Sequence, residues 1–416
     1  MNIKKILSKE FIILLFFFII FIFIRTINFN HFFTFVYDQA GFSTSALEIF
    51  RDKKLQLIGP PISIKFAGRE IFQGGIIYYF FLIFLLLGHF DPKLSTYSFV
   101  IFSGLMIVPL YYGLKDLFNK KIFIYITMLY SLLPFYIHST MSLWNPYIQF
   151  ALTPVLIYTM GLFKKKNTKF IFFLISFITG FLTQFHYQFF LIIFGLLIYY
   201  FIFNKISMYY LLPFFLGLLL GFFPMVLFEL RNNFYNTRTI ILFLIHHKEI
   251  FGKNLSPMNI KEYYFLSTSI FLFIIISSIL KKFLDRQILI YIFIILLFWS
   301  SMVIVVFPPE NTVVKNWTYE DELNVYNIIK NNSVKNYNIS AFYDAKASSQ
   351  KYFLKRDFIN IDFENYLTNK YLYVIYENNK DYKLNRAYEM NTFYPSKVIN
   401  KWKINNKYNL ILSKRI

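Results

Sequence analysis

Long apolar runs separated by short polar connections fill roughly the first three quarters of the chain. Bilayer-spanning helices need about 17–25 mostly apolar residues, and we interpret about nine of the runs as spans on this basis. They lie near residues 11–24, 97–114, 122–140, 147–162, 171–183, 189–203, 209–227, 260–280 and 288–307. The pattern predicts a polytopic α-helical membrane protein with about nine transmembrane helices.

Other segments have patterns too short or too polar for a span. The apolar run 76–87 has only about a dozen residues, which predicts a juxtamembrane or re-entrant helix on the outer face. In 39–54, Phe42, Ala46 and Ile49 recur at helical spacing, which predicts an amphipathic helix along the membrane surface. Glycine and proline in 59–63 and 68–75 predict turns.

The positions of the lysines give the expected orientation. The basic connection 164–169 is expected in the cytoplasm, which places 115–121 and 281–286 there as well. The lysine-rich N-terminus is expected on the same side, with an uncleaved first span, because no small-residue cleavage site follows it. The outer face then holds a long loop, three short polar clusters and the C-terminal part. These are residues 26–96, 144–146, 185–188, 228–258 and 308–416.

The chain therefore divides into a transmembrane domain, residues 1–307, and an extracytoplasmic module, residues 308–416. The module has the polar composition of a water-soluble domain. Its patterns predict helices at 318–331 and 345–353, and strands at 337–343, 371–376 and 408–412. We expect a small α/β domain.

Composition narrows the class of function. Hydrophobic residues make up 57% of the chain, against roughly 45–50% in soluble domains. The net charge of +21 comes from lysines placed between apolar runs, so we expect a lipid bilayer as partner and no nucleic acid. The absence of cysteine excludes disulfides, thiolate catalysis, zinc thiolate sites and iron–sulfur clusters. No phosphate-loop or dinucleotide fingerprint is present.

Asp38 follows the first span closely, and an acid beside a membrane span is a functional candidate. The alternative is that Asp38 is the N-cap of the helix that follows. Glu48 and Asp52 could supply a second carboxylate for a metal or an acid/base pair, or they are solvated surface charges.

Further candidates lie in the other segments assigned to the outer face. Lys65, Arg69 and Gln73, within the glycine-rich stretch, could hold an anion or belong to ordinary turns. Trp144 and Asn145 could contact a sugar, or Trp144 belongs to an aromatic belt.

Two later clusters add charged or titratable side chains on the same face. His186 could contact a phosphate or be an interfacial hydrogen-bonding residue. Glu229 and Arg231 could bind substrate or form an interfacial ion pair.

Four short motifs and the overall layout resemble the GT-C glycosyltransferases, and most of all the bacterial branch related to protein O-mannosyltransferases and aminoarabinose transferases. The motifs are Tyr37-Asp38-Gln39-Ala40, Gly74-Gly75-Ile76-Ile77-Tyr78-Tyr79, Phe185-His186-Tyr187-Gln188 and Phe228-Glu229-Leu230-Arg231. The first resembles the family's acidic first-loop motif, which implies Asp38 as catalytic base. The second resembles the family's Gly-Pro-Leu-Tyr-Tyr segment without its proline, and it adds Tyr78 to the substrate-binding candidates.

The resemblance implies a polyprenyl-phosphate sugar as donor and a hydroxyl group as acceptor. Gln39 stands where many members carry a second acid, so no metal ligands are assigned and no cofactor is firmly implied. Three other functions stay open: a transporter or flippase of lipid-linked sugars, a glycan polymerase, and a catalytically inactive scaffold. The sugar and the acceptor are not indicated by the sequence.

Overall fold

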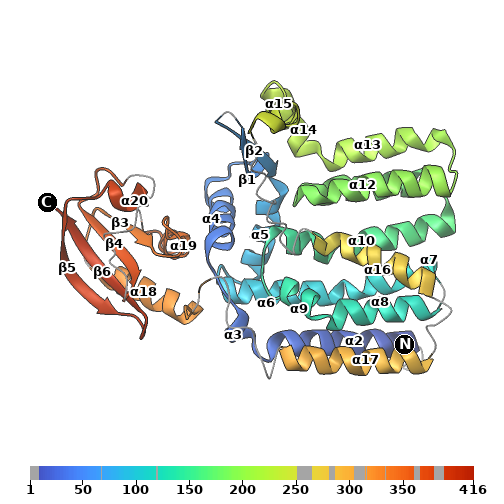
Figure 1. The fold of residues 1–416 in the computed structure, drawn as a ribbon, viewed down its shortest axis with the longest axis horizontal. Coiled ribbons are helices and arrows are strands. Elements are labelled where there is room, and N and C mark those ends of the chain that lie inside the picture. Colours follow the sequence, from blue (N-terminus) through green and yellow to red (C-terminus); the bar gives the residue numbers. More distant parts are fainter. Residues whose placement is uncertain are drawn as a thin grey trace. The chain divides into compact units, whose positions relative to one another are not determined.

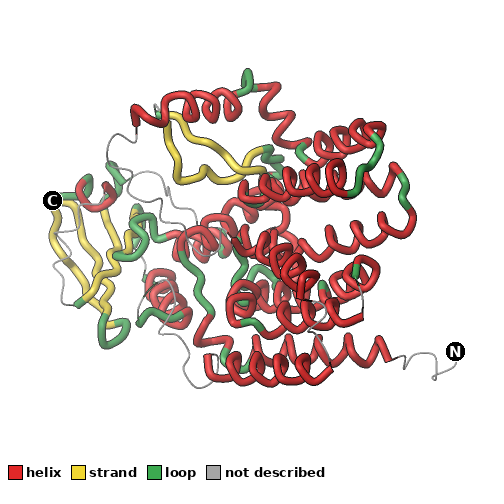
Figure 2. The backbone as a smooth tube through the Cα atoms, turned by 45° about the vertical axis from the view of Figure 1, so that its right-hand side comes forward, coloured by secondary structure: helices red, strands yellow, loops and turns green. Residues whose placement is uncertain are grey.

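The computed structural model describes residues 9–66, 68–118, 120–250, 265–280, 286–303, 314, 316–332, 334–359, 366–378 and 388–416. It is mostly helical, with two small sheets (Figures 1 and 2). The chain forms two compact units, each assembled from three separate segments. The helical unit comprises Met1–Asn28, Leu55–Phe84 and Ser95–Phe307, and the mixed unit comprises Phe29–Lys54, Leu85–Leu94 and Pro308–Ile416.

The helical unit contains a helix in each of the nine apolar runs. The helices are α2 (Lys9–Thr26), α6 (Pro92–Leu105), α7 (Ile107–Leu117), α8 (Lys120–Leu132), α9 (Pro134–Thr140), α10 (Asn145–Lys166), α11 (Lys169–Thr183), η1 (Tyr187–Phe189), α12 (Phe190–Leu197), η2 (Ile198–Phe203), η3 (Met208–Tyr210), α13 (Leu211–Gly221), α14 (Phe223–Arg231), α15 (Tyr235–Ile250), α16 (Leu266–Leu280) and α17 (Arg286–Ser301). The short run forms α5 (Ile76–Leu87), as predicted. Helices distant in sequence meet: α2 and α17 lie side by side in Figure 1, with the Phe16 and Phe293 rings 5.8 Å apart.

Helix length gives fewer candidate spans than the nine expected. Among the described residues, two helical stretches are long and apolar enough to cross a bilayer, Pro92–Leu117 and Asn145–Lys166. The count rises to four if α8 with α9, bent by 59°, and η3–α13 with α14, bent by 73°, each form one span. The other apolar helices have 10–17 residues, and α2 carries charged residues at both ends. Breaks at prolines and at irregular turns shorten the helices that hydropathy alone joins.

Small residues allow the helices α11 and α13 to touch backbone to backbone. A Cβ atom added at Gly217 would lie 2.0 Å from the Ser176 hydroxyl oxygen, and one at Gly221 would lie 2.4 Å from the Phe177 carbonyl oxygen. Ser176 and Gly180 on α11, like Gly217 and Gly221 on α13, are four residues apart. This spacing of small residues is typical of close helix pairs in membranes.

Residues 58–74 form a β-hairpin, where the sequence predicted only turns. β1 (Ile58–Phe66) pairs antiparallel with β2 (Arg69–Gly74), and Gly68 supplies a positive φ of 75° at the turn. Prolines are rare inside strands because they lack the N–H group, so Pro60-Pro61 argued against this assignment. The ladder shifts register between Ile58 and Pro61, and this irregularity accommodates the prolines.

The mixed unit contains the α/β module predicted after residue 307. Its sheet has the order β3-β4-β6-β5, with β3 (Tyr337–Ala341) parallel to β4 (Tyr371–Glu377) and the other pairs antiparallel. The remaining elements are β5 (Ser396–Lys403), β6 (Tyr408–Arg415), α18 (Tyr319–Asn331), α19 (Ser348–Arg356) and α20 (Tyr388–Asn391). Only β5 was not predicted as a strand. Leu372, Val374 and Ile411 from the sheet share a core with Met390 and Phe393.

Two helices from the N-terminal part of the chain complete the mixed unit, α3 (Phe29–Phe32) and α4 (Tyr37–Asp52). The amphipathic helix predicted at 39–54 is therefore confirmed as α4. Its apolar face, however, packs against α19 instead of lying on a membrane surface. The buried residues are Ala40, Phe42, Ser43, Ala46, Leu47 and Ile49.

Candidate functional site

Asp38 occupies the second position of α4 and has an exposed side chain. The N-cap is Val36, so the alternative that Asp38 caps the helix is wrong. Tyr37, directly before it, has a left-handed backbone with φ 47°, which is uncommon for a bulky residue and marks a strained position. A carboxylate in the first helical turn lies where the peptide dipoles favour negative charge. Asp38 is thus an exposed acid directly after a residue with an uncommon backbone conformation.

The two other acids considered on α4 do not pair with Asp38. The carboxylate of Glu48 forms an ion pair with the Lys355 ammonium group, and the Asp52 side chain is exposed at the end of the helix. Among the described residues, no group of three or more His, Asp or Glu side chains is arranged to hold a metal ion.

In the helical unit, the polar cluster at Trp144–Pro146 meets the one at Phe185–Gln188. Asn145, the first residue of α10, is buried, and its amide nitrogen donates to the Gln73 side-chain oxygen at 2.8 Å and to the Phe185 carbonyl oxygen at 2.9 Å. Two of the predicted site residues, Gln73 and Asn145, are therefore in direct contact. Together they join β2, α10 and the connection after α11.

Gln149, one turn further along α10, extends this network, although the sequence analysis did not select it. Its amide nitrogen donates to the carbonyl oxygens of Leu182 and His186, both at 2.8 Å, and its oxygen accepts from the Gln188 amide at 3.0 Å. The signal in the sequence was an amide residue inside the apolar run 147–162, because polar groups at such positions are costly unless paired. The structure shows that Gln149 is fully buried.

The His186 ring is the N-cap of the short helix η1, and its Nδ1 atom accepts from the Gln188 backbone N–H at 3.4 Å. Burial lowers the pKa of His186 to about 4. The imidazole is therefore neutral near pH 7, so the predicted contact with a phosphate would be a hydrogen bond without a positive charge.

Glu229 at the end of α14 caps the next helix. Its two carboxylate oxygens accept from the backbone N–H groups of Asn236 and Thr237, each at 3.0 Å. The interfacial ion pair was one of the two alternatives for Glu229 and Arg231, and here the Glu229 carboxylate instead accepts from the N–H groups that open α15. Arg231 is the last residue of α14 and is exposed.

Asn236 and Tyr187, neither of them selected from the sequence, join this region to the hairpin. The Asn236 side chain accepts from the Phe72 N–H and donates to the Phe72 carbonyl oxygen, both at 3.0 Å. The Tyr187 hydroxyl donates to the same carbonyl oxygen. Since Phe72 precedes Gln73, the clusters around Asn145, His186 and Glu229 form one connected network.

The remaining predicted residues lie around this network with different environments. Arg69 is exposed, and its guanidinium carbon lies 6.0 Å from the centre of the Tyr235 ring. Tyr78 is buried in the first turn of α5. Trp144 is the N-cap residue of α10 and packs edge-on against Tyr147, at 5.2 Å between ring centres. Lys65 lies in β1 opposite Glu70, and its side chain is outside the described part of the structure.

A groove of about 790 Å³ lies beside the network, walled by α12, α13, α14 and α15. Most of its lining is aliphatic or aromatic, and its polar side chains come from Tyr187, Glu229, Asn236 and Thr237. A second cavity of about 630 Å³ lies among α7, α10, α12 and α16 and is also mainly apolar.

The site residues thus fall into two groups, the network of the helical unit and Asp38 in the mixed unit.

The chain matches no protein-family model, no curated protein and no solved structure.

Proposed function

We propose that this chain is a membrane glycosyltransferase that moves a sugar from a polyprenyl-phosphate donor to a hydroxyl group outside the cytoplasm. In this proposal the helical unit crosses the cytoplasmic membrane about nine times, with a GT-C-like arrangement. The module after residue 307 lies on the outer face. The observation that carries the proposal is the groove among α12–α15. Its long apolar wall and small group of polar side chains suit a ligand with an apolar chain and a polar head.

The donor's lipid chain lies along the apolar wall, and its phosphate lies near the neutral polar side chains of Tyr187 and Thr237, away from the Glu229 carboxylate. Arg69, close to Tyr235, and Arg231, exposed at the end of α14, are the cations available for the phosphate. The amide groups around Asn236 hold the hairpin against α15. A head group then meets donors whose positions are already fixed.

Asp38 accepts the proton of the acceptor hydroxyl while that oxygen attacks the anomeric carbon. The new bond joins the acceptor oxygen to the anomeric carbon, and the bond from that carbon to the phosphate oxygen breaks. The polyprenyl phosphate leaves with the bonding electrons, and the arginine side chains stabilise its added charge.

The first test replaces Asp38 by asparagine and measures consumption of a panel of polyprenyl-phosphate sugars by the full-length protein in proteoliposomes. Loss of a general base costs about 10²–10⁴-fold in rate, so we expect transfer to fall by that factor. Asp52→Asn is the matched control, because Asp52 is an exposed acid on the same helix. Its rate should equal that of the unmodified protein.

Undiminished transfer by Asp38→Asn would exclude Asp38 as the base. If the donor crosses the membrane unchanged, with no sugar released from the phosphate, the protein is a flippase. If no donor binds at all, the proposal fails and the result favours a catalytically inactive scaffold.

A second test fills the groove with Val226→Trp, since Val226 lines its apolar wall. The larger ring should raise KM about tenfold or more for a long-chain donor and much less for a donor truncated to two isoprene units. Leu220→Trp is the control, because Leu220 is an exposed residue of α13 outside the groove lining. Equal effects on both donors would show that the chain does not occupy the groove.

A further inference from the structure

The five residues before Asp38 are held by the C-terminal module, within the mixed unit. The buried Ser349 hydroxyl donates to the Phe35 carbonyl oxygen at 2.6 Å, across 314 residues of sequence. The Phe35 ring packs edge-on against Tyr352 at 5.0 Å, and the Phe33 ring packs against Tyr319 at 4.8 Å. These contacts fix the backbone that leads into α4.

The contacts continue to Tyr37, the residue with the left-handed backbone. Its ring meets Tyr343 edge-on at 6.3 Å. The Tyr343 hydroxyl in turn donates to the buried Glu322 carboxylate at 2.5 Å. The Trp317 indole N–H donates to the same carboxylate oxygen at 2.7 Å, and the Gln350 amide donates to the other oxygen.

A buried acid with three side-chain donors holds its neighbours in one geometry, because each donor would otherwise be left unpaired. Around Glu322 these neighbours come from the start of α18, the turn after β3 and α19. All three elements face the segment that ends at Asp38.

We infer that the C-terminal module is a positioning device for Asp38. In this arrangement, Ser349 fixes the Phe35 carbonyl, and Tyr343, oriented by Glu322, fixes Tyr37 so that the carboxylate of Asp38 keeps one direction. The inference rests on the proposed function for its consequence in catalysis. The clamp itself is a structural statement that can be tested separately.

The structural test uses a spin label at Gly41→Cys, in a chain that has no other cysteine. Gly41 lies one turn after Asp38, and a Cβ atom there meets nothing within 4 Å. Ser349→Ala should raise the mobility of this label at least twofold in the full-length protein. The matched control is Ser348→Ala, because the neighbouring serine on α19 is not the donor to Phe35.

Hydrogen exchange of β4 and β6 shows whether the module is still folded in each variant. Tyr343→Phe is the second variant, since it keeps the ring but removes the hydroxyl group bonded to Glu322. If label mobility is unchanged in both Ser349→Ala and Tyr343→Phe, the clamp does not exist, whatever the activity.

The catalytic test measures kcat and donor KM for the same variants. A positioning role predicts that Ser349→Ala lowers kcat about tenfold and leaves the donor KM unchanged. A smaller folded fraction would also lower the apparent kcat, so the comparison is made with variants in which β4 and β6 keep their hydrogen-exchange protection. In an Asp38→Asn background, Ser349→Ala should have no further effect on kcat. A further tenfold loss there would overturn the positioning role. Increased mobility together with full activity in Asp38→Asn would keep the clamp and reject the proposed function.

Discussion

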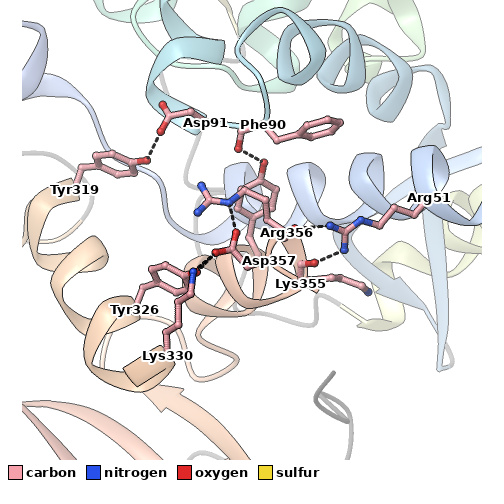
Figure 3. Close-up of polar contacts among 10 residues, drawn as sticks. Arg51, Phe90, Asp91, Tyr319, Tyr326, Lys330, Lys355, Arg356 and Asp357 are labelled. Carbon is pink, nitrogen blue, oxygen red and sulfur yellow. Dashed lines mark hydrogen bonds and ion pairs between the residues drawn. The ribbon is translucent and has the colours of Figure 1, made fainter. Parts of the chain in front are cut away.

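At the buried centre of the network in the helical unit, the side chains that join different elements are neutral amides: Asn145 and Gln149 donate to backbone carbonyl oxygens, and Gln73 accepts from Asn145. The ion pairs of this unit, such as Lys115 with Glu10 and Lys165 with Asp116, lie at helix ends. The mixed unit joins its elements with charged groups instead. The Arg51 guanidinium donates to the Lys355 and Arg356 carbonyl oxygens, and Asp357 accepts from Arg356 and Lys330 (Figure 3).

The difference has a physical reason: neutral amides can be buried away from water at lower cost than charged groups. A neutral amide brings two donors to a buried carbonyl group without the desolvation cost of a charge. Ion pairs at a partly solvated surface keep much of their hydration, so they are tolerated there and contribute modestly. The comparison therefore predicts that added charge is most harmful in the helical unit, and that pH and salt act on the mixed unit.

Arg25 is a charged side chain buried in the helical unit, and like the amides it donates to backbone carbonyl oxygens. Its guanidinium group is fully buried, and its hydrogen bonds go to the Thr140 hydroxyl and to the carbonyl oxygens of Phe21 and Ser131. In a straight helix the N–H group that Pro134 lacks would bond to the Tyr130 carbonyl oxygen, and at the bend this oxygen accepts from Arg25 at 3.4 Å. Arg25 thus supplies the hydrogen bonds that the bend takes away.

The largest effect is expected when charge is placed in the amide network. Gln149→Glu introduces a buried carboxylate and removes the donors to the Leu182 and His186 carbonyl oxygens. An uncompensated buried charge costs on the order of 3–5 kcal/mol. We expect little folded protein at neutral pH, measured by size-exclusion chromatography after heating in detergent. Asp52→Asn, on the surface of α4, should leave the profile unchanged, and a stable Gln149→Glu protein would contradict the comparison.

A smaller effect, confined to the mixed unit, is expected from pH. Burial raises the pKa of Glu322 to about 7, from an ordinary value of 4.5, although hydrogen bonds from Tyr343, Trp317 and Gln350 oppose the shift. A raised carboxyl pKa contributes stability below about pH 4.5, and this contribution is lost as the pH rises through about 7. The folded module should be less stable at pH 8 than at pH 5 by about 3 kcal/mol.

Glu322→Gln should remove this pH dependence and stabilise the module at pH 8. Rotation of the Gln350 amide lets its oxygen, which has no hydrogen-bond partner among the described residues, accept from the new NH₂ group. Hydrogen exchange of β4 and β6 measures the effect in the full-length protein, with α10 and α11 as an internal reference that should not change. An equal pH dependence in the variant would assign the effect to another group.

The smallest effect concerns the ion pair between Glu48 and Lys355, which joins α4 to α19. Both side chains are about one third exposed, so Glu48→Gln should cost about 1 kcal/mol or less, and 1 M salt should reduce that difference. Thermal unfolding at two salt concentrations checks it. A loss of several kcal/mol that salt does not alter would show that the pair behaves as a buried one.

The helices could be read from the sequence because apolar runs and helical periodicity are local properties. The same reasoning found α18, α19, β3, β4 and β6. It missed the hairpin because the glycines and prolines in 59–63 and 68–75 were interpreted as turns. It missed β5 because an edge strand rich in lysine and asparagine has little apolar alternation. The number of transmembrane spans was harder to predict, because bends at residues such as Pro134 divide apolar runs that appear continuous in the hydropathy pattern.

The site was predicted in part. Grouping Asn145, His186 and Glu229 on one face anticipated a network that the structure contains, because the lysine positions constrain all connections at once. Their individual contacts could not be predicted. Glu322 is one of three acids in the first turn of α18, and only the fold distinguishes it from its neighbours by burying it. Nor could local sequence show that α4 packs on a helix about 300 residues away.

The separation of α4 from α19 has a consequence for how the protein is made. Glu48 and Lys355 are 307 residues apart, and at about 5–20 residues per second a ribosome takes roughly 15–60 s to produce that stretch. Throughout this interval the apolar side of α4 lacks α19, its partner in the folded unit. The mixed unit therefore cannot be completed until translation has passed α19, after the helical unit's segments have been made.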